Sequence, residues 1–168
     1  MSDRESAFWR FSLSLYAQPG VADACMVLQD KHGADINVLF FLLYLASRRR
    51  CVDRADVSRI DGHTKLWREQ VVQPLRMVRR ALKNGVAPVP TPASTALRNE
   101  IKRDELHAER LQQETLEQDF PLDNTGTGAA PEAPVTTVAA GNLSAYAACS
   151  WAYSQTEIDT LLRAMNAH

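Results

Sequence analysis

The feature that most constrains the fold is a block of apolar side chains at residues 36–46, interrupted only by Asn37. The block is about half the ~20 residues that a membrane-spanning helix needs, so we predict a helix buried on all sides within a soluble protein. Asp35 is expected to cap its N-terminus, because a carboxylate accepts hydrogen bonds from first-turn N–H groups. The arginines at 48–50 are expected in its last turn, where the helix dipole favours cations. A helix without a polar face needs other helices around it.

Apolar side chains recur at helical spacing through most of the remaining chain, and no strand pattern competes. Helices are expected at about 5–17, 21–32, 64–84, 93–119 and 154–168, with a short helix or turn at 53–60 before Gly62. Pro74 should kink or break the segment at 64–84 near Gln73. The apolar stripes expected to face inward are Trp67, Val71, Leu75, Val78 and Leu82, and then Leu97, Ile101, Ala108 and Leu111.

These elements predict an all-α fold, a single helical bundle of six or seven helices with a long irregular loop before the C-terminal helices. The helical core is expected to span residues 1–120. Residues 121–142 are rich in Gly, Pro, Thr and Ala and poor in large apolar side chains, which predicts a mobile loop. Residues 143–168 are then expected to form helices that pack on the core.

Charge and cysteine content restrict the class of protein. The formal net charge is only −1, so no overall electrostatic attraction to nucleic acid or to an anionic membrane is expected. Cys25, Cys51 and Cys149 are far apart in the chain, which indicates neither a disulfide framework nor a zinc ribbon. Acidic residues precede any apolar stretch at the N-terminus, which argues against a secretory signal. We therefore predict a cytoplasmic protein without a membrane span.

No sequence motif of high information content indicates catalysis. The best metal candidates are Asp104 and His107, because a carboxylate and a histidine three residues apart lie on adjacent helix positions in bundle di-iron sites. Such sites use paired motifs, and a second one is missing here. We therefore predict neither a metal nor a cofactor, and enzymatic activity is the less favoured class. Asn37 needs a buried partner, either a structural hydrogen bond or a ligand.

A basic stripe formed by Arg76, Arg79, Arg80 and Lys83 is the sharpest surface feature. One interpretation is an anion-binding face for nucleic acid, a phosphate or an acidic partner. The favoured interpretation is intramolecular, since the proline-rich residues 86–92 should fold the acidic helix back and bring Glu105, Glu109 or Asp104 to the arginines.

The aromatic section at residues 146–153 raises a further hypothesis. It follows the predicted mobile loop and is rich in alanine, so it could dock in a groove of this molecule or of another one. It is therefore a second candidate for partner binding.

The first forty residues carry three motifs: Trp9-x-Phe11-Ser12-Leu13-x-x-Tyr16, Gly20-Val21-x-x-x-Cys25 and Leu28-Gln29-Asp30-x-x-Gly33-x-Asp35-x-Asn37-x-Leu39. In these motifs the chain resembles a family of short bacterial proteins that are conserved and uncharacterised. The likeness extends through Trp67-Arg68, the acidic helix and Asn142-Leu143. The resemblance implies a compact bacterial housekeeping or regulatory role and supplies no catalytic residues.

These observations lead to one favoured function and two alternatives. We predict a non-enzymatic interaction or regulatory protein that binds a protein partner, whose identity the sequence does not reveal. A helical enzyme or small-ligand-binding protein is the first alternative. Binding of nucleic acid or phosphate through the basic stripe is the second, and nucleic acid is not expected as a partner.

Overall fold

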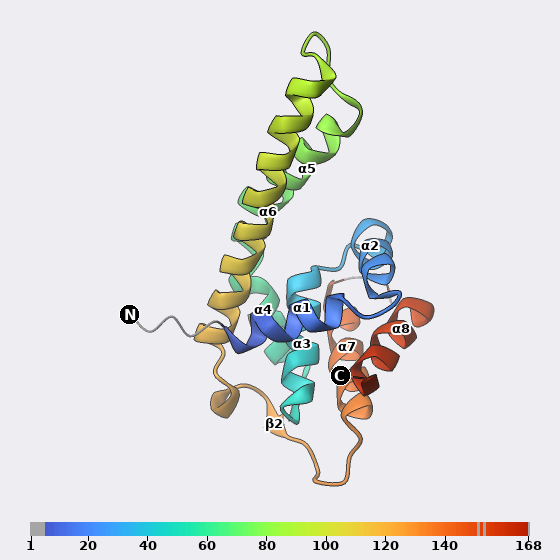
Figure 1. The fold of residues 1–168 in the computed structure, drawn as a ribbon. Coiled ribbons are helices and arrows are strands. Elements are labelled where there is room, and N and C mark those ends of the chain that lie inside the picture. Colours follow the sequence, from blue (N-terminus) through green and yellow to red (C-terminus); the bar gives the residue numbers. More distant parts are fainter. Residues whose placement is uncertain (1–5, 151, 153, 168) are drawn as a thin grey trace. The chain divides into compact units, whose positions relative to one another are not determined.

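The structure, a computed structural model, describes residues 6–150, 152 and 154–167, and helices dominate it (Figure 1). The chain forms two compact units. Unit 1 consists of residues 1–61 and 113–168, and unit 2 consists of residues 62–112. The unit boundaries fall within α4 (Arg54–Trp67) and α6 (Thr91–Asp119). The predicted all-α class is confirmed.

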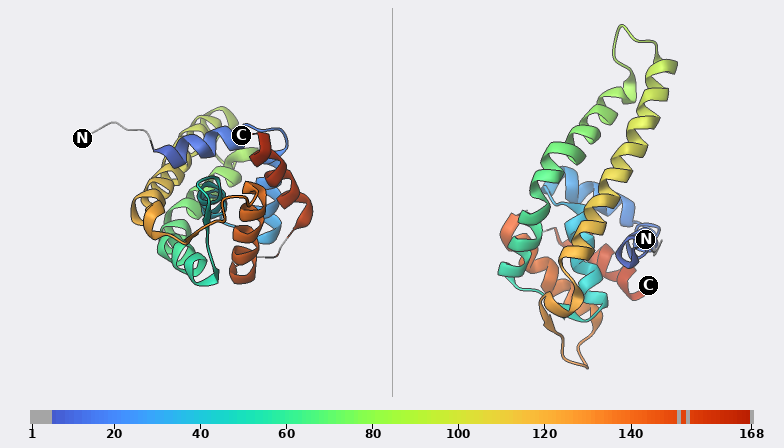
Figure 2. Two further views of the ribbon diagram at one scale, coloured as in Figure 1. Left: turned by 90° about the horizontal axis from the view of Figure 1, so that it is seen from below. Right: turned by 90° about the vertical axis from the view of Figure 1, so that its left-hand side faces the viewer.

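Unit 1 is built around α3 (Ile36–Ser47), which is buried from Asn37 to Ala46. The Asp35 carboxylate caps this helix, accepting from the N–H of Asn37 at 2.9 Å. Around α3 pack α1 (Ala7–Tyr16), α2 (Val21–His32) and α7 (Val135–Ser150), while α8 (Gln155–Ala167) packs on α2 and α7 (Figure 2, left). None of the described helices is both long and apolar enough to cross a membrane.

Aromatic contacts join α1 to α3. The ring centroid of Phe8 lies 5.1 Å from that of Phe41 and 5.3 Å from that of Tyr44. Ser6 caps α1 by accepting from the N–H of Trp9 at 2.9 Å, which fixes where the helix starts. The face of α1 that carries Phe8 and Phe11 is thus covered by the central helix, whereas Leu13 and Tyr16 are each 48% exposed.

The prediction that three arginines lie in the last turn of α3 is wrong. The helix ends at Ser47, and Arg49 adopts a positive φ of 60°. Arg50 and Cys51 form β1 (Arg50–Cys51), which pairs antiparallel with β2 (Thr127–Gly128). The Arg50 side chain donates to the carbonyls of Thr125 and Gly126 at 2.8 and 2.6 Å. Arg49 and Arg50 therefore bind backbone carbonyls in residues 125–133. The prediction failed because these long-range contacts are not visible in the local sequence.

The segment expected to be an irregular loop over residues 121–142 contains more structure than its composition suggested. A short 3-10 turn, η3 (Leu122–Asn124), and β2 precede α7, which already begins at Val135. Asn142, 1% exposed, accepts from the N–H of Val52 at 2.9 Å and donates to the carbonyls of Leu42 and Arg50 at 3.1 and 3.0 Å. These bonds hold the small-residue segment of α7 against α3 and β1. Local sequence patterns do not predict such long-range contacts.

Unit 2 is a helical hairpin. Its first arm contains the end of α4, the π-helical segment η1 (Arg68–Val72), α5 (Gln73–Ala81) and the 3-10 turn η2 (Leu82–Asn84). Its second arm is α6 up to Gln112, and the two arms run side by side (Figure 1; Figure 2, right).

Two predictions about the first arm can now be compared with the structure. The predicted interruption at Gly62 is wrong, since α4 runs through this residue and an isolated glycine is tolerated inside a helix. The irregularity expected near Gln73 is present as η1, in which the N–H of Gln73 donates to the carbonyl of Arg68, five residues back. Pro74 has no N–H with which to continue the regular ladder, which accounts for the change in winding at this point.

Candidate interaction surface

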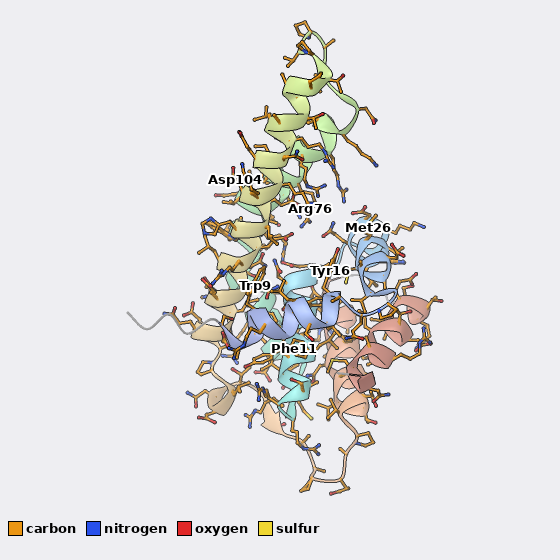
Figure 3. All side chains as sticks on the ribbon, in the orientation of Figure 1. Trp9, Phe11, Tyr16, Met26, Arg76 and Asp104 are labelled. Atoms are coloured by element: carbon orange, nitrogen blue, oxygen red, sulfur yellow. The ribbon has the colours of Figure 1, made fainter. Side chains whose placement is uncertain are left out.

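The arms of unit 2 are joined by an ion-pair seam, defined here as Arg76, Arg79, Glu105 and Glu109. Arg76 donates through Nε to Glu105 Oε1 at 2.9 Å and through Nη2 to Glu109 Oε1 at 2.6 Å. Arg79 donates through Nη2 to Glu105 Oε1 at 3.1 Å and also pairs with Glu105 Oε2. Figure 3 labels Arg76 on α5 and, on the neighbouring α6, Asp104, which precedes the central glutamate. Half of the basic stripe is thus engaged inside the hairpin.

Glu105 is the centre of this seam and is only 5% exposed. Burial by itself raises the pKa of its carboxyl group, but hydrogen bonds and charges from Arg79 and Arg76 outweigh burial and lower the pKa below its ordinary value. Glu105 therefore remains ionised at neutral pH, which keeps two guanidinium groups paired in a partly desolvated place.

Further along the hairpin the contacts between the arms are also polar. Trp67 Nε1 donates to the carbonyl of Ala108 at 3.0 Å, and Gln112 Nε2 donates to Thr64 Oγ1 at 3.3 Å. The buried positions of α6 within unit 2 include Glu105, Ala108 and Gln112. The prediction that Leu97 and Leu111 face inward is therefore wrong, because polar side chains occupy the inner positions.

Of the apolar residues predicted to face inward in unit 2, Ala108 is buried and the other eight are not. We call these eight the apolar series: Trp67, Val78, Leu97 and Leu111 are exposed, and Val71, Leu75, Leu82 and Ile101 are half-buried. Exposure reaches 43% at Val78 and 46% at Leu97. Of the twelve large apolar side chains that are exposed in the described residues, nine lie in unit 2.

The remaining members of the basic stripe, Arg80 and Lys83, are exposed on the hairpin. Asp104 and His107 are exposed on α6. Within the described part of the chain no group of three or more His, Cys, Asp or Glu side chains is arranged to hold a metal ion. Within the described residues, Asp104 and His107 are therefore not part of a group of side chains that could hold a metal ion.

Asn37 and Tyr146 both lie in the interior of unit 1. Asn37, 8% exposed, accepts through Oδ1 from Gln113 Nε2 at 2.8 Å. Tyr146, 1% exposed, accepts from the N–H of Asp35 at 3.0 Å and donates to Asp61 Oδ1 at 3.5 Å. The sequence did not single out Gln113, although an uncharged pair, Gln112-Gln113, within a highly charged helix was a usable signal. Residues 147–150 of the aromatic section continue α7, whereas residues 151 and 153 lie outside the described residues.

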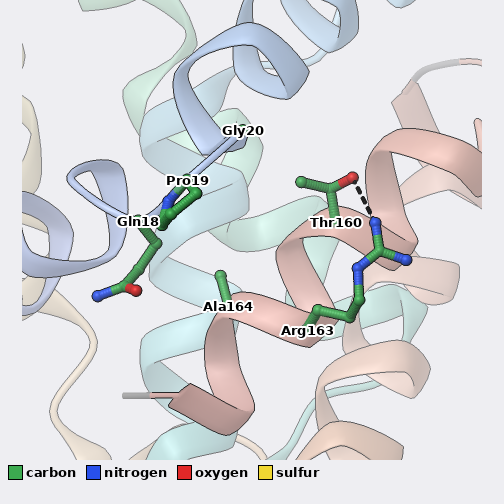
Figure 4. A pocket seen from close by; sticks show the side chains of 6 residues that line it. All are labelled: Gln18, Pro19, Gly20, Thr160, Arg163 and Ala164. Atoms are coloured by element: carbon green, nitrogen blue, oxygen red, sulfur yellow. Dashed lines mark hydrogen bonds between the residues drawn. The ribbon is translucent and has the colours of Figure 1, made fainter.

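An open hollow of about 480 Å³ lies in unit 1 where α8 passes the turn before α2 (Figure 4). Arg163, one of its polar lining residues, donates through Nη2 to Thr160 Oγ1 at 3.0 Å. The lining residues are Gln18, Pro19, Gly20, Thr160, Arg163 and Ala164. Arg163 is exposed, so this hollow lacks the enclosed lining typical of a small-molecule site.

Comparison with known proteins provides one match. A family model described as "Protein of unknown function (DUF2390)" matches residues 7–116. No curated protein and no solved structure matches the chain significantly. The matched residues include α1 to α5 and most of α6, and thus the whole hairpin of unit 2.

Proposed function

Given that the chain belongs to the DUF2390 family, which is defined without a function, we propose from the geometry of its residues that it is a non-enzymatic interaction protein that docks on a partner protein. The docking surface is the apolar series of unit 2. The observation that carries this proposal is the exposure of four members of the series, Trp67, Val78, Leu97 and Leu111, within a unit that holds nine of the twelve exposed large apolar side chains of the described residues.

Exposed apolar residues scattered singly over a surface are ordinary and need no explanation. The apolar series differs in its regularity. Leu97 and Leu111 are separated by nearly four helical turns and so lie on one face of α6, with half-buried Ile101 one turn from Leu97. Such spacing of anchors is typical of a helical surface that receives another protein element.

Within the apolar series, Trp67 is the most specific candidate for an anchor of the partner protein. Trp67 is 38% exposed and is held by its bond to the carbonyl of Ala108, one turn from Leu111, which is 39% exposed. A tryptophan fixed in position and partly exposed loses little conformational freedom on binding, and tryptophan is enriched among residues that dominate interface energies. We place the centre of the docking surface at Trp67 and Leu111.

The experiment compares partners captured from cells that express the protein at its native level. Trp67→Ala and Leu111→Ser together should remove a partner that the unchanged protein captures, while helix content by circular dichroism is retained. Met26→Ser is the control, because Met26 is 57% exposed but belongs to unit 1. Capture of the same proteins by all variants would overturn the proposal.

The cytoplasm is part of this proposal. It is supported by the three free cysteines, Cys25, Cys51 and Cys149. Unpaired thiols persist in a reducing compartment, whereas oxidising compartments favour disulfides.

A further inference from the structure

The docking surface of unit 2 includes a stripe of exposed residues along α6. Its members recur at alternating intervals of three and four residues, which places them on one face of the helix. Leu97 and Leu111, the two ends of the stripe, are 46% and 39% exposed. They lie about 21 Å apart along the helix axis. We call the set the α6 stripe: Leu97, Glu100, Asp104, His107 and Leu111.

The middle of the α6 stripe is negatively charged. Glu100 and Asp104 each carry a carboxylate, and His107 is neutral in the formal charge count at pH 7. Both carboxylates are exposed, and within the described residues neither takes part in an ion pair. They differ in this from Glu105, which is paired with two arginines of the opposite arm. The stripe therefore presents apolar ends with two uncompensated negative charges between them.

The basic residues of unit 2 do not lie on this stripe. Lys102 and Arg103 precede Asp104 by two residues and by one residue, which places them about 200° and 100° from it around the helix axis. The arginines of the ion-pair seam are engaged with the two glutamates of the seam. A molecule that docks along the stripe therefore meets negative charge first, although Lys and Arg outnumber Asp and Glu in the unit as a whole.

We propose that the partner element is an amphipathic α-helix that carries Lys or Arg between its apolar residues. The inference rests on the proposed function, because it names the partner of the same surface. Apolar side chains of the partner contact Leu97 and Leu111, and its cations pair with Glu100 and Asp104. A partner helix of about 15 residues spans this distance. Recognition through anchors at helical spacing is a recurring mode of helix binding.

Charge complementarity distinguishes this occupant from others. Nucleic acid and anionic membranes are repelled by a negative stripe. A second copy of the chain is also disfavoured, because Asp104 stands midway between the two leucines. A two-fold pair of α6 helices aligned along the stripe, parallel or antiparallel, would bring the two Asp104 carboxylates together. A basic amphipathic helix complements both the apolar ends and the carboxylates.

The experiment selects binders of the full chain from a displayed library of alanine-based helical peptides of about 20 residues. Each peptide carries leucines at both ends of one face, and the positions between them are randomised among Lys, Glu and Gln. We expect Lys to exceed Glu at these positions in the peptides selected at ~0.1 M salt. The excess should shrink at ~0.5 M salt, because salt screens exposed charges.

The contribution of the two carboxylates is tested by reversing their charge. Glu100→Lys with Asp104→Lys should select Glu in place of Lys at the randomised positions. The matched control reverses two charges at exposed positions of unit 1, Asp123→Lys with Glu132→Lys, and should keep the preference for Lys. A preference that is the same in both variants would refute the assignment to the α6 stripe.

Affinity gives a second measurement with the best Lys-containing peptide. Glu100→Gln with Asp104→Asn should weaken its binding about fivefold, because each exposed ion pair contributes roughly two- to threefold. Asp123→Asn with Glu132→Gln should leave the affinity unchanged. Equal losses in the two variants would show that only the total charge matters and would overturn the inference.

The outcomes separate this inference from the docking surface on which it rests. If no peptide is selected, or if the selected peptides bind Trp67→Ala with Leu111→Ser as well as the unchanged protein, the docking surface itself fails. If the peptides depend on Trp67 and Leu111 but show no excess of Lys, the surface stands and the basic helix is refuted. A dimer of the chain that Trp67→Ala with Leu111→Ser dissociates, measured by analytical ultracentrifugation, would assign the surface to a second copy and likewise refute it.

Discussion

Replacing Glu105 with glutamine tests whether the ion-pair seam holds the hairpin together. Glu105→Gln preserves the size of the side chain and one acceptor oxygen but removes the charge that faces Arg76 and Arg79. The three hydrogen bonds from these arginines to Glu105 are charge-assisted. In the variant the two at Oε1 become ordinary ones at best, and the one at Oε2 is lost because an amide NH2 group cannot accept a hydrogen bond. The difference is about 1 kcal/mol per bond, and the arginines' exposure of 17% and 23% reduces the total to about 2 kcal/mol.

Native-state hydrogen exchange read by mass spectrometry measures this effect where it arises. A loss of about 2 kcal/mol should accelerate exchange of amides in α5 and in the facing part of α6 roughly thirtyfold. Amides of α3 should change little because they belong to unit 1. Glu100→Gln is the matched control, with the same change of charge at an exposed position of α6. If both variants exchange alike, the seam does not stabilise the hairpin and the reasoning is refuted.

The same pair of proteins gives a test by pH. The folded-state pKa of Glu105 is lowered from its ordinary value of 4.5, so its stabilising contribution is present above that value and is lost as pH falls towards the folded-state pKa. Protection of α5 amides in the unchanged protein should therefore decrease below about pH 4.5, after correction for intrinsic exchange rates. The Glu105→Gln variant should lack this part of the acid sensitivity.

Three further outcomes concern unit 1. Asn142→Asp should lower the free energy of unfolding in urea by about 2–4 kcal/mol, because it replaces an amide donor that serves two backbone carbonyls with an acceptor. Gly126→Ala should destabilise by about 2 kcal/mol or more in the same assay, since its φ is +64° and the added Cβ would lie 2.1 Å from the carbonyl oxygen of Cys51. Burial raises the pKa of Cys25 to about 12, so its thiol should resist iodoacetamide at pH 8 in the native protein and react in urea, as read by mass spectrometry.

The parts of the fold that the sequence predicted depend on local physical signals. The helix at residues 36–46 is apolar all round, and Asp35 caps it as expected. Gly33 adopts the left-handed conformation after α2, which its lack of a Cβ permits. In each case the residue that starts or ends the helix acts on its immediate neighbours, so no knowledge of the tertiary structure was needed.

The errors occur where distant segments decide local structure. Arg49 and Arg50 were expected to continue α3, but Arg50 binds the carbonyls of Thr125 and Gly126, about 75 residues away. Asn142 similarly connects α7 to α3 and β1. Both kinds of contact are side chain to backbone, and they leave no periodic trace in the sequence.

The hairpin shows a different limit of sequence reasoning. Periodicity identified one apolar face on each arm, and the natural inference was that these faces meet. Instead Glu105 occupies the inner position, because two arginines on the opposite arm compensate its burial. Periodicity thus identifies the residues that share a face, whereas the complementarity between arms determines which face turns inward. A polar seam leaves the apolar face available to another molecule.

The net charge of the whole chain hides a difference in charge between the two units. Unit 2 contains ten Lys or Arg and five Asp or Glu, whereas the rest of the chain contains nine and fifteen. The net charge of −1 therefore conceals a hairpin of +5 and a remainder of −6. A surface that approaches the hairpin experiences the local charge within about one Debye length, ~8 Å at physiological salt, and not the total. Weak net charge is thus no argument against an electrostatic interaction between the hairpin and another molecule.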